Sequence, residues 1–278
     1  MSSQNKLFTQ IFVFSLLLNV AGIAYVGLYI MSYRAGISKN INSYLEAYYQ
    51  RKKEHFETLP NRKGEVVFLG NSITDACPWA ELFQNPQIIN RGISGDNSQG
   101  IRARLYEILE SEPSQIFLMM GTNDLAKGKT PDQILSDFEE IFKEVALKSP
   151  YTQVFVQSLL PVNPQKGERL RKNEDIQILN QRLEALCVRQ KVGFIDLHQA
   201  MTLQGVLNPD FSNDGLHLNG AGYQTWKKIL EPFVKKPRNA GDKNDTRPDQ
   251  AEDQPGGAEE DKDQKRTAPK PDTTLRSI

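Results

Sequence analysis

Histidine and cysteine are scarce in this sequence, which excludes the common metal sites. Its 278 residues include three histidines and two cysteines, Cys77 and Cys187. A metal site built on cysteine needs three or four ligands, or histidines at short spacing, and the sequence offers neither. We therefore expect no metal and no cofactor. Cys187 shares a helical face with apolar residues and is interpreted as a core residue, while one disulfide between the two cysteines stays open as an alternative.

An excess of charge of either sign is also absent. Lysine and arginine together number 34, and so do aspartate and glutamate. Nucleic-acid-binding domains usually carry a basic face, so this balance gives no reason to expect a nucleic-acid partner. The segment 235–278 has almost nothing apolar to bury and mixes both signs of charge. Because such a segment cannot offset its ordering entropy, we predict a disordered polar tail over 235–278.

Charged residues are missing from Leu7 to Tyr33, and Ile11–Met31 is almost wholly apolar. A helix of this length can cross a hydrocarbon core of about 30 Å. We predict a short segment over 1–10 followed by a transmembrane anchor over 11–31. A cleavable signal peptide is the alternative, but its apolar region should be roughly 7–15 residues long, and this run is longer.

A stalk is predicted between the anchor and the first strand. Residues 41–56 carry Tyr44, Leu45, Tyr48, Tyr49 and Phe56 at helical spacing. Apolar and aromatic residues at this period mark one face of an amphipathic helix. We therefore interpret 32–59 as a stalk whose helix packs on the following domain.

Apolar runs of strand length alternate with helical segments over 60–234. The strand runs are Val66–Leu69, Ile88–Ile89, Ile116–Met120, Val154–Val156 and Val192–Ile195. Helices are predicted over 98–110, 131–147 and 176–186, and after His217. The second of these helices begins with a capping box, Thr130-Pro131-Asp132-Gln133. Alternation of this kind predicts an α/β domain with a parallel sheet covered on both faces.

Small, hydroxyl and amide residues follow three of the predicted strands. The first ends at Gly70-Asn71-Ser72, the second is followed by Gly92 to Asn97, and the third by Gly121-Thr122-Asn123-Asp124. Ligands of parallel sheets bind beyond the carboxyl ends of the strands, so we expect these residues near one another. Taken alone, the first segment is either an ordinary turn or a serine nucleophile held at a strand tip.

The pair Asp214 and His217 supplies the base that a serine nucleophile needs. Serine is weakly nucleophilic until an imidazole takes its proton. The two residues lie three apart, one helical turn, so the carboxylate can accept the Nδ1 proton and leave Nε2 facing Ser72. His198 stays as an alternative base, whereas His55 lies in the charged stalk.

Three donors are predicted for the oxyanion that ester chemistry creates. These are the backbone N–H groups of Ser72 and Gly95 and the side-chain amide of Asn123. Donors aimed at developing negative charge are where catalytic stabilisation is largest. Each motif alone is weak evidence for a catalytic site, but together, in order on successive strand tips, the motifs are strong evidence for one.

Four blocks now carry a family resemblance. GNSIT, GISGD, GTND and DGLHLN resemble, in order and spacing, the four blocks of the SGNH or GDSL-like hydrolases, over about 64–234. Within the family the chain looks most like bacterial relatives of the catalytic subunits of platelet-activating factor acetylhydrolase and like lysophospholipases. The resemblance implies a three-layer flavodoxin-like fold with a five-stranded parallel sheet. The roles it implies are Ser72 as nucleophile, His217 as base, Asp214 as its partner, and Ser72, Gly95 and Asn123 as oxyanion donors.

One position departs from the family pattern, since Asn71 replaces the usual Asp before the serine. The expected function is a serine esterase that cleaves acyl or acetyl esters of small molecules, lipids or glycans through an acyl-enzyme. An acyltransferase acting on a cell-envelope glycan and a non-catalytic anchored module are the alternatives.

Two arguments oppose each other on the orientation of the anchor. Arg34, Lys39 and Arg51–Lys53 follow the span, which by the positive-inside rule favours a cytoplasmic C-terminal side. A single N-terminal span before a soluble enzyme is more often an export anchor. We expect the domain on the extracytoplasmic, periplasmic side on that second ground.

Overall fold

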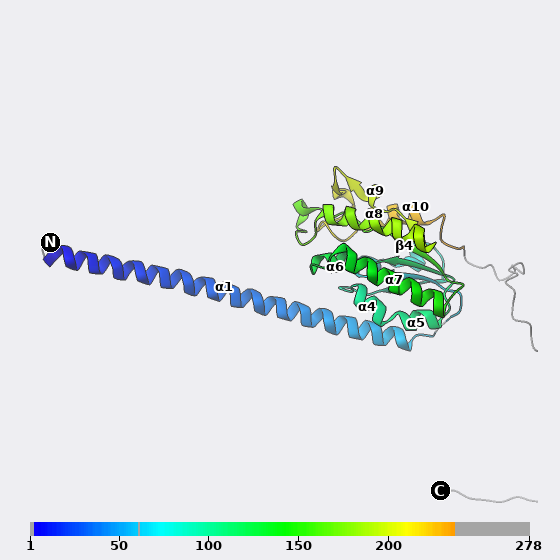
Figure 1. The fold of residues 1–278 in the computed structure, drawn as a ribbon, viewed down its shortest axis with the longest axis horizontal. Coiled ribbons are helices and arrows are strands. Elements are labelled where there is room, and N and C mark those ends of the chain that lie inside the picture. The colour runs from blue at the N-terminus through cyan, green and yellow to red at the C-terminus, as the bar shows by residue number, and fades with distance from the viewer. Residues whose placement is uncertain (1–2, 61, 237–278) are drawn as a thin grey trace, which may run out of the picture. The chain divides into compact units, whose positions relative to one another are not determined.

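The structure, a computed structural model, describes residues 3–60 and 62–236. The predicted tail over 235–278 lies, from residue 237 onward, outside the described residues. The described part contains the predicted α/β domain and one long N-terminal helix, α1, over Ser3–Thr58 (Figure 1).

A five-stranded parallel sheet, ordered β2-β1-β3-β4-β5, forms the centre of the domain. Its strands are β1 (Val66–Gly70), β2 (Ile88–Gly92), β3 (Gln115–Met119), β4 (Gln153–Gln157) and β5 (Gly193–Ile195). Each contains or overlaps one of the predicted apolar runs, and the predicted three-layer fold with a five-stranded sheet is confirmed.

Helices cover both faces of the sheet. They are α2 (Ser72–Asp75), α3 (Trp79–Leu82), α4 (Ser98–Ala103), α5 (Leu105–Glu110), α6 (Thr122–Ala126), α7 (Pro131–Lys148), α8 (Asn173–Gln190), α9 (His198–Met201) and α10 (Gly220–Leu230). A small antiparallel pair, β6 (Thr202–Leu203) and β7 (Val206–Leu207), precedes the last helix. The capping box at the start of α7 forms as predicted, with Thr130 and Gln133 bonding each other's backbone.

Two apolar cores lie on opposite faces of the sheet, and alternation along β1 explains them. Val67 and Leu69 pack with α4, α5, α7 and α8, whereas Val66 and Phe68 pack with Trp79 and with α10. Successive strand side chains point to opposite faces, so a strand buried on both sides must be apolar throughout. Cys77 and Cys187 are buried and free, so the disulfide alternative is not formed.

The helix predicted over 98–110 is broken at Arg104, where α4 ends and α5 begins. The backbone of Arg104 has φ −118° and ψ 9°, outside helical geometry. Its buried guanidinium bonds Asp96 Oδ2 at 2.9 Å and the carbonyl of Gly70 at 3.2 Å. The continuous helix was therefore wrong, and the break accompanies an arginine drawn into the core by a loop carboxylate and a strand end.

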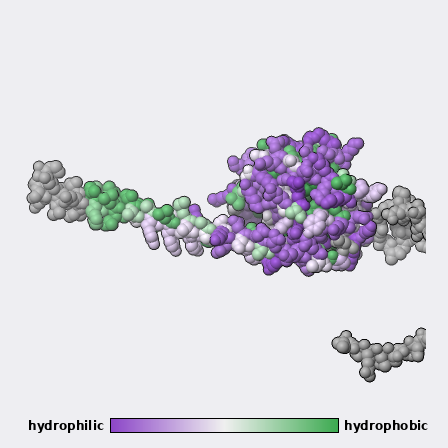
Figure 2. Space-filling view, turned by 60° about the horizontal axis from the view of Figure 1, so that its bottom comes forward, coloured by the Kyte–Doolittle hydropathy of each residue, from purple (hydrophilic) through white to green (hydrophobic). Residues whose placement is uncertain are grey.

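Helix α1 carries both the predicted anchor and the predicted stalk. The part of α1 that begins at Phe12 is long and apolar enough to cross a membrane, and its apolar side chains are exposed. Figure 2 shows hydrophobic surface along this part of α1, while the domain surface in that view is mostly hydrophilic. The C-terminal part of α1 contacts the domain, since Phe56 is buried and Tyr49 Oη donates to the carbonyl of Gly100.

Candidate active site

Three loops of the site begin at the same level of the sheet. Gly70 of β1 pairs with Gly92 of β2 on one side and with Met119 of β3 on the other. Ser72, Gly95 and Asn123 follow these strand ends within a few residues. The register therefore brings the three predicted strand-tip groups to one edge, at the carboxyl ends of adjacent strands.

Ser72 stands at the first position of α2, directly after its N-cap Asn71. Asn71 Oδ1 accepts a hydrogen bond of 3.0 Å from Ile73 N, as N-cap residues do. Asn71, which replaces the Asp usual in the family, thus still makes the capping hydrogen bond. Asn71 Nδ2 is buried and has no hydrogen-bond partner among residues 3–60 and 62–236. Gly92 lets β2 approach α2 closely, because a Cβ there would lie 2.2 Å from Asp75 N.

A continuous series of hydrogen bonds joins a serine, a histidine and an aspartate. Ser72 Oγ lies 3.0 Å from His217 Nε2, and His217 Nδ1 lies 2.7 Å from Asp214 Oδ2. The contacts span 145 residues of sequence between serine and histidine. This arrangement lets an imidazole take the serine proton while the carboxylate fixes the ring's orientation.

Asp214 and His217 meet in a loop rather than on a helical turn, so that part of the prediction was wrong. Asp214 Oδ1 accepts from the backbone N–H groups of Leu216, at 2.9 Å, and His217, at 2.8 Å. Gly215 between them has φ +84°, and a Cβ there would lie 2.3 Å from the carbonyl oxygen of Asn163. An aspartate-centred turn, which needs glycine at its bend, thus gives the same three-residue spacing.

The pKa of Asp214 is lowered to about 2. Partial burial acts to raise it, but hydrogen bonds from the His217 ring and from the two backbone N–H groups outweigh burial. The carboxylate is therefore ionised at neutral pH. It can accept a hydrogen bond from Nδ1–H of His217 and stabilise positive charge that develops on the ring.

His198, the alternative base, lies elsewhere. Its Nδ1 is 3.4 Å from Thr202 Oγ1, and its Nε2 is buried without a hydrogen-bond partner in the described part of the chain. Burial lowers the pKa of His198. The structure thus brings His217, rather than His198, to the serine.

The Asn123 amide is held on two sides. Its Nδ2 donates to the carbonyl of Asp96 at 2.7 Å, and its Oδ1 accepts from Arg171 Nη2 at 2.7 Å. Sequence reasoning missed Arg171, which also pairs with Glu168 at 2.8 Å. These residues lie outside any helix, so their three-residue spacing gave no signal of the pair. Gly95 adopts φ +82° in the neighbouring loop, a conformation that glycine accommodates easily.

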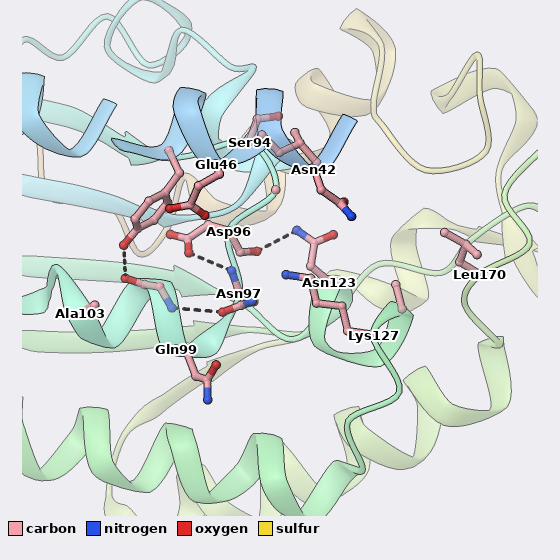
Figure 3. Close-up of a pocket in the computed structure, with 15 residues that line it drawn as sticks. Asn42, Glu46, Ser94, Asp96, Asn97, Gln99, Ala103, Asn123, Lys127 and Leu170 are labelled. Atoms are coloured by element: carbon pink, nitrogen blue, oxygen red, sulfur yellow. Dashed lines mark hydrogen bonds between the residues drawn. The ribbon is translucent and has the colours of Figure 1, made fainter. Parts of the chain in front are cut away.

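A cavity of about 720 Å³ adjoins the site: Ser94, Gly95 and Asn123 line it, whereas Ser72, Asp214 and His217 do not. Its other walls come from α4, from the segment after α6 and, unexpectedly, from α1. Figure 3 shows Asn42 on α1 pointing toward Asn123, and the bond from Asn123 to Asp96 beside it. The cavity therefore adjoins two of the strand-tip groups, Gly95 and Asn123.

A family model for the GDSL-like lipase/acylhydrolase family matches residues 68–225, which include all five predicted site residues. The chain belongs to this family. It is an ester-hydrolysing enzyme, and the alternative of a non-catalytic module is not supported. The family resemblance seen in the sequence is confirmed.

Curated relatives and solved structures agree with this membership. The bovine platelet-activating factor acetylhydrolase IB subunit alpha1 is 29% identical over 185 residues, covering 63% of this chain and 76% of the relative. A Streptococcus pneumonia structure described as a platelet activating factor is 29% identical, with a TM-score of 0.64, covering 72% of this chain and 99% of that one. A GDSL-like lipase from Bacteroides thetaiotaomicron is 26% identical, with a TM-score of 0.58, covering 67% and 96%.

Proposed function

We propose that the protein is a serine esterase in which Ser72, His217 and Asp214 form the catalytic triad. The observation that carries this proposal is the unbroken hydrogen-bond series from Ser72 Oγ through both ring nitrogens of His217 to Asp214. Gly95 and Asn123 follow the strands on either side of β1 and complete an oxyanion hole with the Ser72 backbone N–H.

The reaction runs in two halves. Ser72 Oγ attacks the acyl carbon while His217 Nε2 takes its proton, and the carbonyl oxygen gains negative charge beside the oxyanion donors. The tetrahedral intermediate collapses, and His217 passes the proton to the departing alcohol. Water then attacks the acyl-enzyme with His217 again as base. The acid is released and the serine hydroxyl is restored.

Helix α1 suggests where this esterase acts. We propose that residues 11–31 anchor the protein in a membrane and that the catalytic domain lies on the extracytoplasmic side. An exposed apolar helical segment of this length supports the anchor. The substrate is then an acyl or acetyl ester of a lipid or glycan within reach of that surface.

Replacing the nucleophile tests the proposal. In full-length protein, Ser72→Ala should lower kcat for p-nitrophenyl acetate by roughly 10³-fold or more, since the covalent route is lost. Wild-type protein should react with a fluorophosphonate probe, and Ser72→Ala should not. Ser136→Ala, at an exposed position on α7, is the matched control and should behave as wild type. Full activity or labelling of Ser72→Ala would overturn the proposal. A separate measurement distinguishes hydrolysis from acyl transfer: a hydrolase forms free acid when no glycan acceptor is present.

A further inference from the structure

Helix α1 is linked through Asp75 to the loop that carries Gly95. Tyr48 Oη donates to Asp75 Oδ2 at 2.5 Å, and Lys52 Nζ pairs with Asp75 Oδ1 at 2.9 Å. The same Asp75 Oδ2 accepts from Ser94 N at 3.1 Å. One carboxylate at the end of α2 therefore joins the stalk to the oxyanion loop.

The same helix lies directly against the site. The Leu45 side chain is the nearest neighbour of Gly95, 3.4 Å from the position a Cβ would occupy there. One turn further on, Tyr49 bonds the backbone of α4 at Gly100. The stalk thus forms a wall of the 720 Å³ cavity and is more than a spacer between membrane and domain.

The lining of this cavity mixes apolar side chains with hydrogen-bonding ones, and Glu46 and Lys127 among the latter are charged. Its hydrogen-bonding side chains include Asn42, Glu46, Tyr49, Asn97, Gln99 and Lys127. Amides can donate to and accept from hydroxyl groups, whereas a fatty acyl chain offers them no hydrogen-bond partner. The volume lies within the range of roughly 300–1,000 Å³ that ligand pockets span. The chemistry favours a hydroxyl-bearing ligand.

The distance between the cavity and the apolar segment of α1 also favours a hydroxyl-bearing ligand. Asn42 follows Met31 on one continuous helix, about 16 Å further along its axis at about 1.5 Å per residue. The ester of a bilayer lipid stays near the interface, so it would have to leave the membrane to reach this cavity. A glycan that extends from a surface can reach it directly.

We propose that this cavity binds the sugar portion of an acylated glycan, with Asn42 and Glu46 of α1 as specificity residues. The proposal rests on the esterase function proposed above. Asn42 and Glu46 are exposed, so their replacement leaves the core intact. They offer an amide and a carboxylate to sugar hydroxyls, while the ester carbonyl lies between Ser72 and the oxyanion donors.

Truncation of the two side chains tests it. For Asn42→Ala and Glu46→Ala in the full chain, kcat/KM is measured with an O-acetylated chitooligosaccharide, with p-nitrophenyl acetate and with micelles of an alkyl-acetyl-glycerophosphocholine. The ratio of oligosaccharide to p-nitrophenyl acetate should fall about tenfold, chiefly through KM, the size of one lost hydrogen bond. Glu54→Ala, on an exposed position of α1 outside the cavity, should keep the wild-type ratio. Unchanged ratios in all variants, or a fall confined to the phospholipid, would overturn the proposal.

A chemical block gives an independent measurement. Both native cysteines are buried, and burial raises the pKa of each thiol to about 12, so neither should react with a bulky maleimide. Modified Asn42→Cys should lose oligosaccharide turnover at least tenfold more than modified Glu54→Cys. Equal turnover of the two would exclude the cavity as a sugar site. An active Ser72→Ala would refute the esterase proposal itself. If Ser72→Ala is inactive but the Asn42 and Glu46 variants keep the wild-type ratio of oligosaccharide to p-nitrophenyl acetate activity, only the sugar site is refuted.

Discussion

The guanidinium of Arg171 holds the oxygen of the Asn123 amide. Arg171 Nη2 donates to Asn123 Oδ1 at 2.7 Å, and Arg171 Nε donates to the carbonyl of Thr122 at 2.9 Å. Because a cation occupies Oδ1, the amide nitrogen must face the other way, toward Asp96 and the Gly95 loop. Arg171 therefore fixes Asn123 as a donor, the orientation that an oxyanion hole requires.

Removal of either side chain should slow the chemical step. Asn123→Ala is expected to lower kcat for p-nitrophenyl acetate by roughly 10²–10³-fold, the usual effect of losing an oxyanion donor. Arg171→Met should lower kcat by about tenfold with little change in KM, because the donor is present but no longer oriented.

A double variant separates positioning from folding. If Arg171 acts through Asn123, Arg171→Met should have almost no further effect on kcat in an Asn123→Ala background. Additive losses of kcat would instead mean that Arg171 supports the loop by another route. Melting temperatures of all three variants serve as the control for stability.

The ionised Asp214 leads to a prediction about pH. A pKa of about 2 in the folded protein lies below the ordinary value, so the carboxylate stays charged at all pH values above about 4. The stability it contributes is present above pH 4 and is lost as the pH falls toward 2. Asp214→Asn should keep the fold but lower kcat about 10²–10⁴-fold, since the wrong ring nitrogen is then favoured as donor.

The measurement is the kcat of wild type and Asp214→Asn at several pH values from 4 to 9. The kcat of the variant should stay far below that of wild type over the whole pH range, because Asp214 does not titrate within it. A deficit that disappears at pH 5 would show that Asp214 is already protonated there.

Local sequence patterns were sufficient for much of this fold. Helix α7 was predicted because Thr130 and Gln133 signal its start and its apolar face repeats every three to four residues. The strands were predicted because burial on both faces demands unbroken apolar runs such as that of β1. Such signals are contained within a few consecutive residues.

What could not be predicted depends on contacts between distant segments. The break at Arg104 reflects bonds to Asp96 and to the end of β1, which helical periodicity does not record. The Asp214 turn has the spacing of a helical turn without being one. Arg171 lies outside regular secondary structure and acquires its role only because the fold carries it to Asn123.

The buried pair of Asp96 and Arg104 should make stability depend on pH. Burial raises the pKa of Asp96 to about 6, while the charge and hydrogen bond of Arg104 act to lower it. With the folded pKa above the unfolded value, the folded state binds more protons between pH 4 and 6, so stability decreases as pH rises through that window. Asp96→Asn lacks this titration.

Denaturant unfolding at pH 4 and at pH 6.5 checks the sign. The stability of wild type relative to Asp96→Asn should fall by on the order of 2 kcal/mol between the two pH values. A rise over the same interval would mean that Arg104 dominates and that the folded pKa lies below the ordinary one.

The link from α1 through Asp75 predicts that the stalk influences catalysis. Burial and the bond to Asp75 raise the pKa of Tyr48 to about 12, so its phenol remains a donor at neutral pH. In the variant Tyr48→Phe/Lys52→Met, Asp75 keeps Ser94 but loses both stalk partners, and α1 should dock less firmly. Amide exchange at Ser94 and Gly95 should accelerate, and kcat/KM should fall about 3–10-fold, as expected for two partly exposed bonds of roughly 0.5–1 kcal/mol each. Glu54→Gln is the control, because Glu54 lies at an exposed position of α1. Unaltered exchange and activity would mean that the oxyanion loop is held without the stalk.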